Sequence, residues 1–130
     1  GVQTCALPIS RTALAPEQYE SEIADAAASG LVSDDAFSDV IAHLATVHPS
    51  RYIRLVDAIS TIGLRDVTQL TDQSAALRFV AFVDRAYDAQ IPIRATGRPL
   101  DEVFGDEMLG GGYRKKYLRA ISRLVALTHS

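Results

Sequence analysis

The stretch that decides the fold is residues 59–96, which read ISTIGLRDVTQLTDQSAALRFVAFVDRAYDAQIPIRAT. Residues 59–67 form a short β-branched run, and residues 91–96 form a second one, so each predicts a strand. Between them, Thr71 and Asp72 can cap a helix that runs to about Ala89. A strand, a helix and a strand make a βαβ unit, which predicts two parallel strands joined by a right-handed crossover.

The helix between these strands is apolar around most of its circumference. Its polar residues fall on one narrow side: Arg78, Asp84, Arg85 and Asp88. The remaining face is too wide for a helix that covers a sheet and otherwise faces water. We therefore expect this helix to pack against the sheet and against a further element.

The segments before this unit carry helical signals. Residues 16–28 are rich in Ala and Glu and predict a helix that ends at Gly30. Good N-cap residues then precede apolar positions at helical spacing, which predicts a helix of about residues 34–46. Pro49 suits the first turn of a further short helix.

After the second strand, three consecutive glycines break the chain at residues 110–112. A final helix is expected over about residues 113–127. The fold class predicted by all these elements is α/β, with a small parallel sheet, a βαβ core at residues 59–96 and flanking helices.

Composition limits the class of protein. The chain has 130 residues, is 48% hydrophobic and carries a formal net charge of −3, which suits one domain with its own core. Its apolar runs are too short for an integral membrane segment, and its single cysteine, Cys5, cannot form an internal disulfide. We expect a reduced, cytoplasmic protein.

The first nine residues, GVQTCALPI, stand apart from the rest. They lack an initiator Met and resemble the translation of a sequencing-library adapter; the alternative is a genuine extended tail. We set residues 1–9 aside as an artefactual tail. Residues 10–130 are then expected to be a fragment cut at its N-terminal side.

Charge is distributed unevenly along the chain. Residues 10–50 carry seven acids against one arginine, and residues 51–109 carry nine acids against seven arginines. Residues 110–130 carry five cations and no acid. The mildly acidic total argues against a dedicated nucleic-acid binder, whereas the basic last helix is compatible with an anionic partner.

Four motifs together resemble a known family. They are HPSRY at 48–52, LRDV at 64–67, ALRFVAFVDRAYD at 76–88 and GGYRKKYLRAISRL at 111–124. In this order and at these spacings they look like the C-terminal third of the ZapE-type (AFG-like) P-loop ATPases. The closing helix is similar to that of actinobacterial members, and the resemblance covers residues 31–128.

The resemblance implies an AAA+-like ATPase that uses ATP and Mg in the full-length parent. Members of the family are associated with cell division in bacteria, so homo-oligomers or cell-division proteins are the implied partners. A Walker A loop needs G-x-x-x-x-G-K-[ST], in which the lysine reaches the outer phosphates. Lys115 and Lys116 are the lysines of this chain, and neither follows a glycine. We therefore expect the fragment to bind no ATP and to be inactive alone.

Asp66 is the candidate for a Walker-B-like position. A Walker B strand ends in an aspartate that serves the magnesium and a glutamate that orients water. The strand here ends Leu64-Arg65-Asp66-Val67, so the aspartate is present and the glutamate is not. The alternative is a strand-terminal aspartate that caps the following turn.

Histidines and serines offer little other chemistry. No Cys or Glu stands at ligand spacing from His43, His48 or His129, so no metal site is predicted. His48 and Ser50 are expected to form a capping and turn cluster rather than a catalytic dyad.

The basic helix holds the candidate contact residues. Lys115, Arg119 and Arg123 follow one another at intervals of four and form a cationic stripe. The stripe is open to three interpretations: a solvated helix face, a nucleotide contact within one subunit or across to a neighbour, or a site for an acidic or nucleic-acid partner. Arginine suits phosphate because its planar fork binds two oxygens. The rival to the ATPase hypothesis is an interaction module that binds an acidic partner through this helix.

Overall fold

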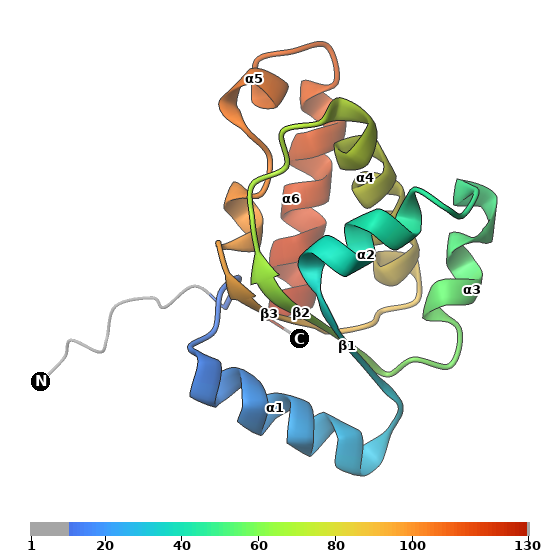
Figure 1. Ribbon diagram of the computed structural model, residues 1–130, viewed down its shortest axis with the longest axis vertical. Coiled ribbons are helices and arrows are strands. Elements are labelled where there is room, and N and C mark those ends of the chain that lie inside the picture. Colours follow the sequence, from blue (N-terminus) through green and yellow to red (C-terminus); the bar gives the residue numbers. More distant parts are fainter. Residues whose placement is uncertain (1–10, 130) are drawn as a thin grey trace, which may run out of the picture.

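The computed structural model describes residues 11–129; the adapter-like residues 1–9 lie outside them. A three-stranded sheet occupies the centre, with helices on both faces (Figure 1). Its strands lie in the order β1-β2-β3, and both neighbouring pairs are parallel. They are β1 (Val32–Ala36), β2 (Thr61–Val67) and β3 (Ile93–Gly97). The predicted α/β class with a small parallel sheet is confirmed.

The predicted βαβ unit is present. Helix α4 (Gln73–Asp88) connects β2 to β3, and Ile62 of β2 is in register with Ile93 of β3. The carboxylate of Asp72 accepts a hydrogen bond from the Ala75 backbone N–H at 2.9 Å, so of the two predicted caps, Thr71 and Asp72, the helix uses Asp72.

Helices form a layer on each face of the sheet. Helix α1 (Pro16–Ser29) covers one face, where Tyr19 and Ile23 reach Gly63 of β2. The other face carries α4 together with three further helices: α2 (Phe37–Leu44), α3 (Tyr52–Val56) and α6 (Arg114–Thr128). Short turns of helix complete the chain: η1 (Pro49–Arg51), η2 (Leu100–Glu102) and α5 (Asp106–Leu109).

The main core lies between the sheet and this larger helical layer. Phe79 of α4 is fully buried at its centre, with its ring 5.4 Å from Phe37 and 6.4 Å from Phe104. Along the same helix, Val83 and Ala86 are also fully buried. Helix α4 packs against α6 as well as against α2 and α3. The prediction that this helix packs against the sheet and against a further element is therefore confirmed.

The prediction of a helix over residues 34–46 is wrong at its start. Residues 34–36 belong to strand β1, and helix α2 begins at Phe37. The backbone of β1 is paired with β2, with Asp34 opposite Gly63. Pairing with β2 outweighs the local preference of an aspartate for a helix cap. The reason is that hydrogen bonds between the two strands satisfy backbone N–H and C=O groups along the segment.

The apolar spacing in α2 was nevertheless interpreted correctly. Phe37 and Leu44 are buried, and Val40 and Ile41 pack against the core.

Within residues 11–129, no helix combines the length and apolar character needed to cross a bilayer.

Candidate functional site

The carboxyl ends of β2 and β3 are the natural place for a ligand in an open parallel sheet. The two strands lose register there: Leu64 pairs with Ala95 but Val67 pairs with Gly97. The extra residue makes a β-bulge at Asp66, whose φ of 56° lies in the left-handed region. Gly97 has a φ of 95°, and a Cβ there would lie 2.6 Å from the Val67 nitrogen. Glycine is therefore required at this position.

Asp66 is exposed at this end of the sheet. Its backbone N–H donates to the hydroxyl of Thr96 at 3.0 Å. Its carboxylate accepts no hydrogen bond from residues 11–129, so the expected turn cap is not observed. The residue lines a cavity of about 320 Å³ together with Glu20, Arg65 and Thr96.

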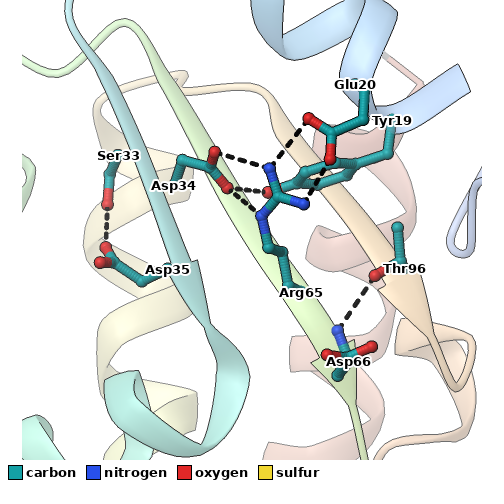
Figure 2. A network of polar contacts seen from close by, with 8 residues as sticks. All are labelled: Tyr19, Glu20, Ser33, Asp34, Asp35, Arg65, Asp66 and Thr96. Atoms are coloured by element: carbon teal, nitrogen blue, oxygen red, sulfur yellow. Dashed lines mark hydrogen bonds and ion pairs between the residues drawn. The ribbon is translucent and has the colours of Figure 1, made fainter. Parts of the chain in front are cut away.

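Arg65 is held by two carboxylates beside this cavity, as Figure 2 shows. Its guanidinium donates to Asp34 at 2.8 and 2.9 Å and to Glu20 at 2.6 and 3.0 Å. The Tyr19 hydroxyl donates to Asp34 at 2.6 Å, and the guanidinium lies 4.7 Å from the centre of the Tyr19 ring. One arginine of β2 thus ties α1 to β1.

These contacts change the pKa of each group. Hydrogen bonds from Arg65 hold the pKa of Glu20 and that of Asp34 below their ordinary values. Hydrogen bonds to the same carboxylates raise the pKa of Arg65. Burial, and then the bond to Asp34, raise the pKa of Tyr19. The guanidinium is engaged on two sides, so Arg65 is a structural clamp and not an available phosphate ligand.

A second cluster anchors α1 further along its length. Glu22 accepts from Arg11 and forms an ion pair with Arg94 of β3 at 2.7 Å, while Gln18 donates to it at 3.0 Å. Burial opposes the charge of Glu22, but hydrogen bonds from Arg11 and Gln18 keep its pKa below the ordinary value. Sequence reasoning found neither cluster, because arginines distant in the chain join them; Arg65 and Glu20, for example, are 45 positions apart.

The three residues of the predicted cationic stripe on α6 differ in their surroundings. Lys115 and Arg119 are exposed, whereas Arg123 is half-buried. The Arg123 guanidinium forms an ion pair with Asp84 of α4 and lies 4.9 Å from the centre of the Tyr87 ring. Arg123 therefore holds α6 against α4, while Lys115 and Arg119 face solvent. A nucleotide contact by any of them stays a prediction.

The histidine cluster is a turn, as expected. The His48 ring nitrogen Nδ1 accepts from the Ser50 backbone N–H at 3.1 Å and lies 2.8 Å from the Ser50 hydroxyl. Among residues 11–129, no three His, Cys, Asp or Glu side chains are grouped as a metal site requires.

Comparison with known proteins decides the family. A family model described as AFG1-like ATPase matches residues 11–130, nearly the whole chain. The chain belongs to the AFG1-like ATPase family. No curated protein and no solved structure shows significant similarity to it. The expected family resemblance is thus confirmed at the level of the AFG1-like ATPases.

Membership of the AFG1-like ATPases associates this chain with ATP chemistry. The 130 residues of this AFG1-like chain contain no Walker A motif. Among the predicted site residues, exposed polar groups remain at two places. Asp66 stands at the end of β2, and Lys115 and Arg119 stand on the outer face of α6.

Proposed function

We propose that this chain is the C-terminal part of a ZapE-type, cell-division-associated ATPase that works in the cytoplasm. The full-length parent binds and hydrolyses ATP with Mg and acts as a homo-oligomer or with cell-division proteins. One observation carries the proposal: the AFG1-like ATPase match extends over residues 11–130, which hold no G-x-x-x-x-G-K-[ST] motif. The phosphate-binding loop must then be supplied by another part of the parent.

The missing loop makes the 130-residue chain inactive by itself. A Walker A loop binds phosphates through consecutive backbone N–H groups and a lysine. Asp66 offers one exposed carboxylate, which fits a Walker-B-like position, but the strand carries no neighbouring glutamate. One carboxylate does not hold Mg and ATP, because Mg is usually bound through carboxylates together with the substrate phosphates.

Arg119 is the residue that we propose for a phosphate contact in the assembled ATPase, with Lys115 beside it. Both are exposed on α6 and separated by one helical turn. Arg123 is already paired with Asp84, so it orients the helix from which the other two project. Whether they act within one subunit or toward a neighbour is the question that subunit-mixing experiments answer.

Three measurements test the proposal. The reading frame upstream of residue 10 is expected to encode a Walker A loop; a stop codon and a separate start there would contradict it. The purified 130-residue chain is expected to show no calorimetric binding of Mg-ATP, and binding in the micromolar range would refute this. In the complete chain, we expect Arg119→Ala to lower kcat by about tenfold or more. Lys116→Ala, which removes an equal charge off the stripe, is the matched control.

A second function rests on the charge of the last helix. Residues 110–130 carry five cations and no acid, and four of these cations are exposed. Such a face suits an acidic partner protein, in which case this AFG1-like chain acts as an interaction module rather than as part of a working ATPase. A genuine start codon near residue 10 favours this alternative. An acidic partner would also be released steeply by salt, because exposed ion pairs are screened.

A further inference from the structure

Strand β1 has an outer edge that no other strand covers within residues 11–129. The Leu31 carbonyl accepts from the Ser60 backbone N–H at 2.8 Å and so faces β2. Because the direction of backbone groups alternates along a strand, those of Val32 and Asp34 face outward. No described residue hydrogen-bonds to these outward groups. The edge therefore presents free donors and acceptors to a further strand.

A cavity of about 400 Å³ lies beside this edge, on the side of the larger helical layer. Buried side chains give it an apolar wall, among them Leu44, Ile62 and Phe82. Exposed carboxylates of Asp35 and Asp39 also line it. A strand placed along β1 would thus have an apolar pocket for one of its side chains and acids within reach of others.

The two acids are free to meet a cation. Asp35 accepts a hydrogen bond from the Ser33 hydroxyl at 2.9 Å, and within residues 11–129 neither Asp35 nor Asp39 forms an ion pair. His43 is the other titratable group that lines the cavity. In the surrounding segment, residues 10–50, Glu20, Glu22 and Asp34 are already paired with arginines, so Asp35 and Asp39 are the acids beside the cavity that favour a basic ligand.

We propose that the β1 edge is a docking site for an extended segment of a partner protein in which an apolar residue is flanked, two positions away on each side, by Lys or Arg, so that all three side chains lie on the face of the cavity. The segment adds to β1 as a fourth strand through backbone hydrogen bonds. An apolar side chain enters the cavity, and cationic side chains meet Asp35 and Asp39. This surface is separate from α6 and goes beyond the proposed ATPase function.

A second copy of this chain does not fit the same edge. Pairing β1 with β1 would bring Asp34 and Asp35 of one copy close to the same acids of the other. Like charges on neighbouring strands are destabilising. The acids therefore prevent edge-to-edge association and at the same time select a basic partner.

The first test uses labelled peptides in which lysines stand two positions before and two positions after one central phenylalanine, with threonine at the positions between. Fluorescence anisotropy with the 130-residue chain should show at least about tenfold tighter binding than for the peptide in which glutamate replaces lysine. The double variant Asp35→Lys/Asp39→Lys should bind the basic peptide about tenfold more weakly. Glu17→Lys/Asp25→Lys, at two exposed positions of α1, changes the net charge equally and is the matched control; it should change the affinity less than about twofold. An equal loss in both variants would overturn the proposal.

The second test examines strand addition in the unaltered protein. Methylating alternate backbone nitrogens of the basic peptide removes the donors that a new strand needs, so its affinity should fall at least about tenfold. An unchanged affinity would show another binding mode and refute the proposal. Sedimentation velocity of the chain alone should show a monomer. A dimer abolished by Asp35→Lys/Asp39→Lys would identify a second copy as the occupant and would also refute it.

Discussion

Replacing Gly63 with alanine is expected to push helix α1 off the sheet. A Cβ at this position would lie 2.3 Å from the Tyr19 hydroxyl oxygen and 2.9 Å from Cδ1 of Ile23. It would also lie 3.1 Å from the Ser33 carbonyl oxygen, which is backbone. Ordinary contacts begin near 3.4 Å, so α1 must move by roughly 1 Å to admit one methyl group.

The cost follows from how firmly Tyr19 is held. Its side chain is fully buried, and its hydroxyl donates to Asp34 at 2.6 Å. The ring cannot turn aside without losing this bond to a carboxylate. Overpacking of a core costs about 1–3 kcal/mol; with the strained hydrogen bond we expect a loss of about 2–3 kcal/mol. For a chain of this size that corresponds to a Tm lower by about 8–12 °C.

Urea unfolding followed by far-UV circular dichroism measures this loss. Gly112→Ala is the matched control, because a Cβ there meets nothing within 4 Å; its free energy of unfolding should stay within about 0.5 kcal/mol of the original value. Tyr19→Phe removes the clashing oxygen, so the double variant with Gly63→Ala should be less destabilised than the two single losses added together. Strict additivity, or a Gly63→Ala protein as stable as the original, would refute the packing of α1 described above.

Other predictions concern the two arginine contacts. The pKa values of Glu20 and Asp34 lie below their ordinary values of 4.5 and 3.8, so their pairing with Arg65 stabilises the fold above about pH 5 and is lost as the pH falls further. Urea unfolding between about pH 3 and 7 should show this decline, and Arg65→Met should flatten it; an equally steep decline would contradict the clamp. Arg123→Ala should lower the free energy of unfolding by about 1–2 kcal/mol, while Lys115→Ala should change it by less than about 0.5 kcal/mol. Equal effects in thermal melts would show that Arg123 is not the residue that joins the helices.

Local patterns predicted most of the secondary structure. Helix α4 was found from the spacing of its apolar residues and from Asp72, both of which act within a few residues of the chain. The strand β1 was missed because its residues Val32–Ala36 include Asp34 and Asp35, which are uncommon in strands. Only the neighbouring strand β2, which begins at Thr61, makes that segment extended.

The candidate site was less accessible to such reasoning. The spacing of Lys115, Arg119 and Arg123 correctly placed all three on one helix, but it could not show that Asp84 neutralises one of them. In the sequence, Arg65 was noted only as the residue before Asp66, yet it joins α1 to the sheet through Glu20. Nothing in the residues around Arg65 signals a partner 45 positions away.

By itself, the amino-acid sequence determined the class of fold, the βαβ unit and the family resemblance, because each rests on short-range periodicity, caps and contiguous motifs. The tertiary structure alone decided that β1 is a strand, that Arg65 and Arg123 are engaged, and that an acidic cavity borders a free edge. These features depend on contacts between residues that are distant in the chain. Such contacts arise only when the sheet and its two helical layers bring them together.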